Sequence, residues 1–540
     1  MFSQPLKSLR SLPPWLRNAL LILLVCGVFF RFYHLDQKVY WGDEVFTSIR
    51  ISGYTAGEVT EQIYTGKPLT IGDVTAYQRP NPDRGFSETM KALAGSPEHT
   101  PLYYLLARYW VKWLGNDVIY NDAKAYIFLI RSLSAIISLL AFPCLYWLCW
   151  ELFASDPVAA IALGLFAVSP FHVLYAQEAR EYSLWTVTIL LAGATFLHAL
   201  KRNHVLAWIA YLVSLTLALY ACLFSIFIAI AHGIYLAILW KKQPNTLLIN
   251  YEDKTFKGGM HKPYLITSLT SIILFSPWLF VIIQNFGKLE ENVAHLSQEK
   301  SNLPLIWMLN LSRSFFDFNH GASAINPLSY ATVGASVYAL YYLCRHQKQE
   351  VWLFILTLIG VMGSSLILSD LILGGIRSTI ARYPIPCYLG ITIAVAYVLA
   401  KKLETYAETP KNYVKWRRIA IAFFAFGLLS CSMSSQREVW WHKSPFKTRH
   451  NPEIARIVNG SANPLLISDA SVERVLSLCY RLDDRVILKL VLPQQPITIP
   501  NAMGDIFLYQ PSPQLREDIK MTLDRPVVST DKDWLWKVKF

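Results

Sequence analysis

Two adjacent carboxylic acids, Asp43 and Glu44, follow the first long apolar run of the chain, at residues 15–33. Aromatic residues stand on both sides of the pair, as Trp41 and Phe46. Partial removal from water raises the pKa of a carboxylate and suits it to act as a base, and paired carboxylates also suit a divalent cation. One acid could instead cap the helix that the following residues predict. Capping explains one carboxylate and leaves the aromatic setting unexplained.

His99 is the next residue that could take part in chemistry, within the segment EHTP at 98–101. Proline suits the first turn of a helix, so the spacing predicts a helix that begins at Pro101, with His99 in the loop before it. A protonated histidine there could bind an anion. A helix cap or a packing group is the alternative.

A third polar group occupies the segment SPFHVLYAQEAREY at 169–182. Tyr175, Glu178 and Tyr182 are three and four residues apart, so a continuous helix would carry them on one face. Arg180 would lie about 200° from Glu178 on that helix, so the two side chains can share a face only if the helix breaks. The charges at Glu178, Arg180 and Glu181 could instead be solvated groups at a helix end.

Three arginines occupy positions that need an explanation. Arg377 and Arg382 lie in the Gly- and Pro-containing segment GGIRSTIARYPIP at 374–386, where Tyr383 follows Arg382. The planar guanidinium group matches phosphate oxygens with two hydrogen bonds. Arg131 lies in an apolar run, where an arginine is costly unless it is paired or functional. An ion pair with one of the two adjacent acids is an equal alternative for Arg131.

The composition indicates what kind of protein must position these residues. Of 540 residues, 54% are hydrophobic, 16% are charged and 17 are tryptophan, and long apolar runs recur, which indicates a multi-pass α-helical membrane protein. The net charge of +13 arises from short Lys and Arg clusters between those runs, so it reflects orientation in the membrane and does not predict nucleic-acid binding. The eight cysteines include no CxxC pair, which argues against a cysteine-based zinc site.

Eleven apolar runs are predicted to cross the membrane. With the N-terminus inside, the basic clusters at 201–202, 241–262, 345–348 and 401–418 fall on the cytoplasmic side, as the positive-inside rule requires. The turn at 151–157 lacks a basic residue, and the loop with Arg377 and Arg382 is basic although it lies outside. The first run follows Lys7 and Arg10 but lacks a signal-peptide cleavage site, so it is expected to be retained. The predicted spans are 15–33, 126–150, 157–176, 182–200, 205–221, 223–240, 264–285, 328–344, 351–372, 384–400 and 418–435.

The segment 99–115 is expected to lie on the outer membrane surface. It is short for a span and carries Arg108 and Lys112 four residues apart. If it crossed, every later loop would change side. With this segment outside, the polar groups described above all fall on the outer face.

The C-terminal segment 436–540 has a different composition and predicts a small extracytoplasmic α/β domain. Strands are expected within 461–470, 484–493, 504–511 and 533–540, and helices at 452–460, 471–482 and 513–523. The segment contains no glycine-rich phosphate loop. Acceptor binding and a structural lid are both open as its role. The expected domains are therefore 1–435, with a first outer loop at 34–125, and 436–540.

Five motifs occur in one order: WGDE at 41–44, HTPLYYLL at 99–106, Arg131, SPFHVLYAQEAREYSL at 169–184 and RYPIP at 382–386. In these motifs the chain resembles the GT-C superfamily of membrane glycosyltransferases. The most similar groups are the bacterial relatives of dolichyl-phosphate-mannose protein mannosyltransferases and the aminoarabinose transferase that modifies lipid A. Thr100 departs from the family motif, which has proline there. The resemblance implies a GT-C fold, a polyprenyl-phosphate-linked sugar donor and an acceptor on the extracytoplasmic side.

Such a transfer needs one base and several cations, because the acceptor hydroxyl loses a proton while negative charge grows on the leaving phosphate. By resemblance, Asp43 is the general base, and Glu44 and Glu178 are supporting acids. No metal cofactor is expected by resemblance, although Mg²⁺ or Mn²⁺ bound by these three acids is an alternative. The residues expected to bind substrate are His99, Arg131, Arg180, Tyr182, Arg377, Arg382 and Tyr383.

Other classes of membrane protein stay open. A transporter or flippase of a lipid-linked sugar would share the ligand, and a lipid-linked ligase or polymerase would share much of the pattern. Transporters usually place ionisable residues near the middle of the membrane, often in paired repeats. Here the candidate residues lie at the ends of spans, and the two halves show no repeat. The expectation is an enzyme of the bacterial plasma (inner) membrane that faces the periplasm, with a lipid-linked donor, an extracytoplasmic acceptor and membrane lipids as partners.

Overall fold

The computed structural model describes residues 12–242, 261–298, 302–404, 410–443, 447–493, 495, 504–531 and 533–540. Its elements form two units. The helical unit comprises Met1–Tyr33, Ser96–Tyr103 and Ser134–Gln436, and the α/β unit comprises His34–Gly95, Tyr104–Leu133 and Arg437–Phe540. Most of the first loop, expected to belong with the membrane spans, therefore falls with the C-terminal segment. The basic residues Lys7, Arg10, Lys254 and Lys257 of the predicted cytoplasmic clusters lie outside the described residues.

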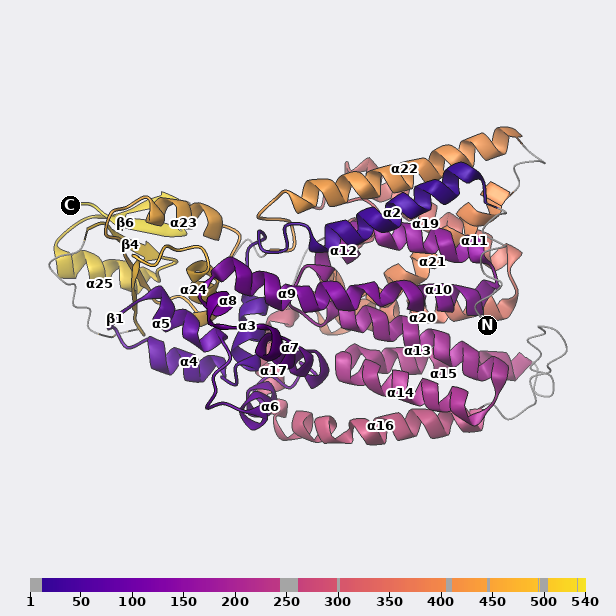
Figure 1. Cartoon of the computed structure of the whole chain (residues 1–540), viewed down its shortest axis with the longest axis horizontal. Coiled ribbons are helices and arrows are strands. Elements are labelled where there is room, and N and C mark those ends of the chain that lie inside the picture. Colours follow the sequence, from indigo (N-terminus) through magenta and orange to yellow (C-terminus); the bar gives the residue numbers. More distant parts are fainter. Residues whose placement is uncertain are drawn as a thin grey trace. The chain divides into compact units, whose positions relative to one another are not determined.

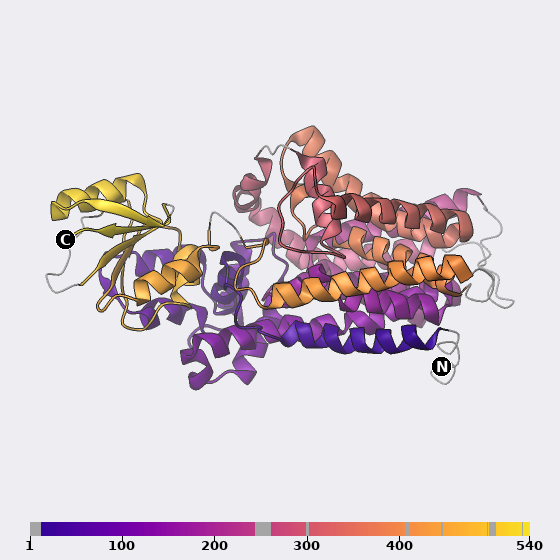
Figure 2. The same cartoon turned by 90° about the horizontal axis from the view of Figure 1, so that it is seen from above.

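Long helices that run side by side form the helical unit (Figures 1 and 2). Apolar runs of this length become helices because lipid offers no partner for backbone N–H and C=O groups. Shorter elements of the same unit are η3 (Leu223–Ser225), α17 (Phe286–Val293), η4 (Ala294–Ser297), α18 (Leu303–Ser312) and η5 (Arg377–Thr379). The other helices of the unit are α2 (Pro14–Phe32), α10 (Ala141–Phe153), α11 (Asp156–Ala167), α12 (Pro170–Ala176), which is short, α13 (Tyr182–Arg202), α14 (Val205–Ala221), α15 (Ile226–Lys242), α16 (His261–Gln284), α19 (Pro327–His346), α20 (Gln349–Leu373), α21 (Ile385–Glu404) and α22 (Pro410–Ser435). Helix α9 (Ala123–Leu139) belongs to both units.

All eleven predicted spans are helical. Among the described residues, eight helices are long and apolar enough to cross a membrane, and the bent pair α11 and α12 would make nine. The predicted span 126–150 corresponds to α9 and α10 together. Two of the eleven predicted spans are not among these nine. They are α14, which is only 17 residues long, and α19, which does not reach the same apolarity. The chain is thus a multi-pass membrane protein.

Two interruptions shape the segment that was predicted as a polar site. A bend of 60° separates α11 from α12, where Pro170 opens α12 and disfavours helical backbone at the residue before it. A turn over 177–181 then separates α12 from α13. The continuous helical face expected for Tyr175, Glu178 and Tyr182 therefore does not form.

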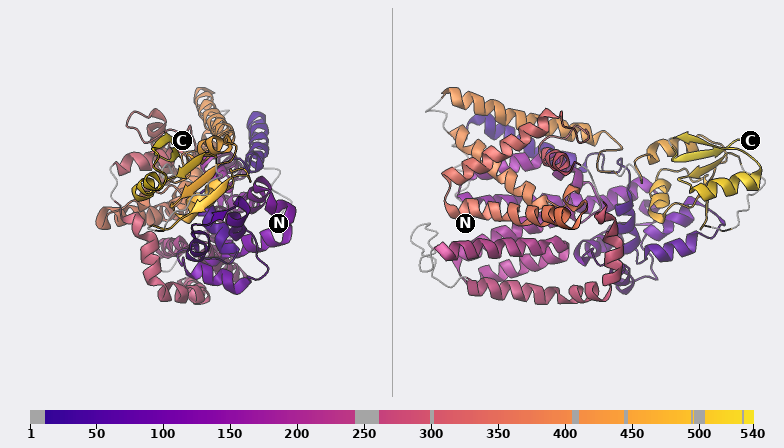
Figure 3. Two further views of the ribbon diagram at one scale, coloured as in Figure 1. Left: turned by 90° about the vertical axis from the view of Figure 1, so that its left-hand side faces the viewer. Right: turned by 180° about the vertical axis from the view of Figure 1, so that it is seen from behind.

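A six-stranded sheet organises the C-terminal part of the α/β unit (Figure 3). Its order is β1-β3-β2-β4-β6-β5, in which β2, β3 and β4 are parallel and the other pairings are antiparallel. The core between the sheet and α25 includes Leu465, Ile467, Leu508, Leu515 and Ile519. The elements are β2 (Leu465–Ser468), β3 (Ile487–Leu490), β4 (Ile506–Tyr509), β5 (Val527–Asp531), β6 (Leu535–Val538), α23 (Asn451–Asn459), α24 (Val472–Cys479) and α25 (Pro513–Leu523).

The sheet agrees with the predicted elements except at its two edges. Strand β5 was not predicted and pairs with β6. At the other edge, β1 (Pro68–Leu69) comes from the first loop, and its Leu69 lies opposite Leu488 of β3. In β6 the buried residues are Leu535 and Val538, which point to opposite faces of the strand.

The first loop adds short helices to the same unit. They are α3 (Gly42–Ile51), α4 (Ala56–Ile63), α5 (Ile71–Thr75), η2 (Ala76–Gln78), α6 (Phe86–Ala94) and α8 (Asp117–Asn121). Helix α7 (Pro101–Leu114) begins at Pro101 as predicted, but Arg108 does not face solvent. Its guanidinium donates to the carbonyl of Ile51 at 2.6 Å and to the hydroxyl of Thr89 at 2.8 Å. From Tyr104 onward, α7 is part of the α/β unit.

Candidate active site

Glu44 and Arg131 form a buried ion pair inside the α/β unit. Arg131 Nε donates to Glu44 Oε1 at 2.8 Å, and Arg131 Nη2 donates to Glu44 Oε2 at 2.7 Å. Both side chains are fully buried. This is the structural alternative that the sequence left open for Arg131.

The rest of the Arg131 guanidinium binds the chain that precedes α3. Nη1 donates to the carbonyls of Leu35 at 2.8 Å and Lys38 at 3.0 Å, and Nη2 donates to the carbonyl of Val39 at 3.0 Å. All five N–H groups of the guanidinium are therefore satisfied. Arg131 fixes the path of the chain into α3.

Glu44 also caps α3. The backbone N–H of Trp41 donates to Glu44 Oε2 at 3.4 Å, which is the half of a capping box that the acid supplies. Lys443 brings a second cation to within 3.6 Å of Glu44 Oε2, and its ammonium lies 5.2 Å from the centre of the Trp41 ring. The sequence analysis missed Lys443, and only the aromatic run WWHK at 440–443 could have drawn attention to it.

Asp43 differs from its neighbour because its side chain is partly exposed. It lies in the first turn of α3, and its backbone carbonyl accepts a hydrogen bond from Thr47 Oγ1 at 3.1 Å. Nearby, the Tyr40 hydroxyl donates to the carbonyl of Glu44 at 3.0 Å. Burial, followed by the proximity of Tyr480, Tyr126 and Glu44, raises the pKa of Tyr40 well above its ordinary value, so this phenol stays neutral. Of the two adjacent acids, Asp43 is the one with access to solvent.

A second group of predicted residues meets in the helical unit, at the end of α2. The amide of Gln177 donates to the carbonyls of Phe30 at 2.7 Å and Tyr33 at 2.9 Å, which attaches the 177–181 turn to the C-terminal end of α2. The backbone N–H of Arg180 donates to the carbonyl of Glu178 at 2.7 Å within this turn. Glu178 itself is almost fully buried.

His99 lies inside a cluster of charges. Arg180 Nη2 is 3.4 Å from His99 Nδ1 and 3.1 Å from Glu181 Oε1. Glu98 lies 3.7 Å from the other ring nitrogen of His99 and accepts hydrogen bonds of 3.2 Å from the amide of Asn292. Burial raises the pKa of Glu181, but the charges of Arg180 and His99 outweigh it and hold that pKa well below its ordinary value. Glu181 and Glu98 were not assigned a role from the sequence.

Tyr182 lies close to two of the predicted phosphate-binding cations. The Arg180 guanidinium is 5.8 Å from the centre of the Tyr182 ring, and the Arg382 guanidinium is 5.6 Å from it. Arg382 also lies 5.7 Å from the Tyr383 ring. The break between α12 and α13 makes this possible, because it turns Arg180 toward the start of α13. Together with His99, these four residues form what we call the arginine–tyrosine cluster.

Arg377 is not part of this cluster among the contacts described. Its guanidinium lies 3.4 Å from Asp370 Oδ1 and donates to the carbonyl of Gly374 at 2.8 Å. The backbone N–H groups of Arg377 and Ser378 also donate to Asp370, at 2.9 and 2.6 Å. These contacts hold the 374–379 turn against α20.

Arg313 is a further buried cation that the sequence analysis did not single out. It follows α18 and donates to Asn310 Oδ1 at 3.0 Å and to the carbonyl of His320 at 3.2 Å. Burial lowers the pKa of Arg313 to about 10, against the opposing effect of Asp317 and two tyrosines, Tyr175 and Tyr388. It adds positive charge near Tyr175.

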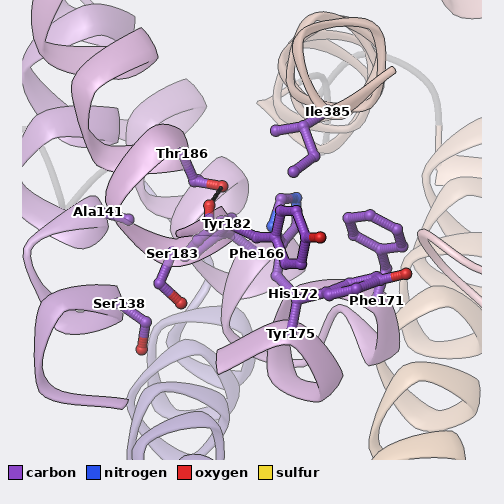
Figure 4. A pocket seen from close by; sticks show the side chains of 10 residues that line it. All are labelled: Ser138, Ala141, Phe166, Phe171, His172, Tyr175, Tyr182, Ser183, Thr186 and Ile385. Carbon is purple, nitrogen blue, oxygen red and sulfur yellow. Dashed lines mark hydrogen bonds between the residues drawn. The ribbon is translucent and has the colours of Figure 1, made fainter. Parts of the chain in front are cut away.

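A small cavity adjoins the cluster (Figure 4). Its volume of about 10 Å³ has room for about one water molecule and none for a sugar. Tyr175, Tyr182 and His172 contribute to its wall. Within the described part of the chain, no group of three or more His, Cys, Asp or Glu residues is placed to hold a metal ion.

The fold can be compared with known proteins. No family model matches the chain, and no curated protein matches its sequence. The structure is similar to that of ArnT, a lipid A aminoarabinose transferase, from Cupriavidus metallidurans bound to undecaprenyl phosphate, with a TM-score of 0.53, 13% identity and coverage of 96% of this chain and 97% of that chain. The chain has the GT-C fold. ArnT in the apo state gives a TM-score of 0.52 and 11% identity over 96% of this chain and 97% of that one.

A third solved structure shares the fold. The oligosaccharyltransferase of Archaeoglobus fulgidus in the apo form gives a TM-score of 0.50 and 12% identity over 89% of this chain and 65% of that chain. The polytopic helical fold with a small α/β C-terminal part, predicted from the five motifs and the apolar runs, is confirmed. At 11–13% identity the likeness concerns the fold.

Proposed function

We propose that this GT-C protein is a glycosyltransferase that moves a sugar from a polyprenyl-phosphate-linked donor to an acceptor on the extracytoplasmic face of the membrane. The observation that carries the proposal is the arginine–tyrosine cluster, in which Arg180 and Arg382 both lie close to the Tyr182 ring at the start of α13. Two guanidinium groups beside a histidine suit the phosphate of a lipid carrier. ArnT, which shares the fold, has undecaprenyl phosphate bound.

In the proposed reaction an acceptor hydroxyl attacks the anomeric carbon of the sugar. The bond between that carbon and the phosphate oxygen breaks, its electron pair remains on the phosphate, and the phosphate becomes a dianionic monoester. Arg180, Arg382 and His99 stabilise this growing charge. Asp43 takes the proton of the acceptor hydroxyl as general base. These cations supply the charge that a metal ion provides in other enzymes, so the proposed transfer needs no metal.

Glu44 and Arg131 act in this proposal as positioning residues. Their ion pair and the bonds of Arg131 to the chain before α3 fix the first turn of that helix, where Asp43 lies. Glu178 is proposed to support the site as a buried acid of the 177–181 turn. The enzyme is proposed to belong to a bacterial plasma membrane, with its site facing the periplasm.

The test uses the purified full chain, in lipid nanodiscs to follow transfer and in sealed lipid vesicles to follow movement of the donor. It is supplied with undecaprenyl phosphate linked to radiolabelled hexoses or pentoses, together with a periplasmic and membrane acceptor fraction. The proposal expects label on the acceptor, release of undecaprenyl phosphate and unchanged rates in EDTA. Movement of the labelled lipid across the bilayer without any product would overturn it in favour of a transporter.

A further inference from the structure

An open cleft lies wholly within the α/β unit, and the proposed transfer does not use it. Its volume is about 620 Å³, within the range of sites for small organic ligands. Its walls come from the loop after α3, from α4, β1, α5 and η2, from the loop at 79–82 and from α8. Three of its lining residues are tyrosines.

The tyrosines are held in place by neighbouring groups. The Tyr54 ring is covered on one side by the Arg84 guanidinium, 3.8 Å from its centre, and meets the Tyr77 ring edge to face at 5.1 Å. The Tyr120 hydroxyl donates to the carbonyl of Val111 at 2.9 Å. Tyr77 and Tyr120 are partly exposed, so aromatic surface faces the cleft from two elements. Rigid aromatic rings of this kind bind a ligand at little cost in conformational entropy.

Polar side chains surround these rings with both donors and acceptors. Arg79 Nη1 donates to Asn121 Oδ1 at 2.8 Å, and the Asn81 amide donates to the Tyr54 hydroxyl at 2.7 Å. Each asparagine keeps further hydrogen-bonding capacity, since an amide has two donors and two acceptor lone pairs. Asp117 and Gln62 add exposed polar groups at the rim. Such a wall matches a ligand with many hydroxyl groups.

The charge of the lining restricts the ligand further. The lining contains two carboxylates, those of Asp73 and Asp117, and one guanidinium, that of Arg79, which leaves one net negative charge. An acidic ligand is therefore disfavoured. Among the described lining residues, Leu69 is the sole branched aliphatic one, and the other apolar surface comes from tyrosine, proline and alanine side chains.

We infer that this cleft binds a saccharide chain that carries no acidic group. Tyr54 follows the C-terminal end of α3, whereas Asp43 lies in the first turn of the same helix. At 1.5 Å per residue, the eight steps along α3 from Asp43 to Ile51 cover about 12 Å, and Tyr54 follows three residues later. The cleft thus holds the remote part of an extended glycan acceptor while its reactive end lies near Asp43. This acceptor role rests on the proposed function, but saccharide binding does not.

Saccharide binding is measured without any lipid-linked sugar donor. A failure to bind saccharide can therefore be distinguished from a failure of the proposed transfer. The full chain in nanodiscs is titrated with maltotetraose, mannotetraose, chitotetraose and a tetramer of galacturonic acid, with saturation-transfer NMR to identify the contacting sugar protons. We expect at least one uncharged tetrasaccharide to bind and the acidic tetramer not to bind. Tyr77→Ala should weaken binding about tenfold, and Tyr77→Phe should restore it.

Tyr109→Ala is the matched control. Tyr109 is a partly exposed tyrosine of the same unit that packs against Trp113 and does not line the cleft. Binding in this variant should equal that of the parent. Absence of binding by all uncharged tetrasaccharides, or equal losses in Tyr77→Ala and Tyr109→Ala, would overturn the inference. Capture of a Ser/Thr-rich peptide at Tyr77 in place of the saccharides would overturn it as well.

Discussion

Glu44 and Arg131 share two hydrogen bonds of 2.8 and 2.7 Å across 87 residues of sequence, and neither side chain is exposed. The pair explains why two acids stand side by side in the chain. Glu44 serves the structure by capping α3 and neutralising Arg131, and Asp43 is left with access to solvent. The adjacent acids therefore have different tasks in the mechanism proposed above.

Asp43→Asn should abolish transfer without weakening the fold. Asparagine keeps the size of the side chain and caps helices about as well, but it cannot take the proton of the acceptor. The turnover should fall by about 10² to 10⁴, with donor affinity and Tm unchanged. Full activity in this variant would remove Asp43 as the base. Glu61→Gln, an exposed acid on α4, serves as the control and should retain the parent rate.

Replacement of one member of the buried pair should destabilise the protein strongly. Arg131→Met leaves Glu44 without its main partner, and Glu44→Gln leaves a buried guanidinium without its carboxylate, so each should lower the free energy of unfolding by about 3–5 kcal/mol. The double variant should lose less free energy of unfolding than the two single variants lose together. Thermal unfolding of the variants in nanodiscs measures these changes in stability. Arg456→Gln, which breaks the exposed pair with Glu438, should change the free energy by about 1 kcal/mol or less.

Arg382→Lys should weaken donor use although it keeps the charge. A lysine cannot offer the paired N–H groups of a guanidinium to phosphate, so kcat/KM for the lipid-linked donor should fall about 10- to 100-fold. Arg377→Lys is the matched comparison because Arg377 is bound to Asp370 and Gly374. That variant should lower the Tm and leave donor affinity intact. Equal donor affinity in Arg382→Lys and the parent would exclude Arg382 from the phosphate site.

The ion pair of Glu181 with Arg180 should make stability depend on pH in the acid range. The pKa of Glu181 is lowered in the folded protein, so its stabilising effect is present above the ordinary value of 4.5 and is lost as the pH falls below it. Between pH 6 and pH 3 the Tm of the parent should therefore fall more steeply than that of Glu181→Gln. Parallel curves of Tm against pH for the parent and Glu181→Gln would contradict a stabilising ion pair between Glu181 and Arg180. The exposed Glu61→Gln variant should follow the parent curve.

Reporter fusions should decide whether α14 and α19 cross the membrane. If both cross, as the eleven-span scheme requires, a reporter after Lys241 is cytoplasmic and one after Phe540 is extracytoplasmic. If neither crosses, the side of Phe540 is unchanged, but the reporter after Lys241 moves outside. Alkaline phosphatase and green fluorescent protein fusions at both positions measure the two cases. Cytoplasmic activity after Phe540 would contradict the scheme as a whole.

The sequence alone determined the class of protein, the positions of the helices and the fold family. Hydropathy and the positive-inside pattern are properties of short segments, so they predicted eleven helices without knowledge of packing. Most strands of the C-terminal sheet were predicted for the same reason, because alternation and turn residues act locally. The helix start at Pro101 also follows from local backbone chemistry.

Only the tertiary structure decided which charges are partners. Glu44 meets Arg131 and Lys443, and β1 joins β3, all across separations that no local pattern encodes. The break at 177–181 brings Arg180 to Tyr182, whereas the spacing alone favoured a continuous face. Burying a charge is costly unless the charge has a partner. Which residue becomes that partner depends on the packing of elements that are distant in the sequence.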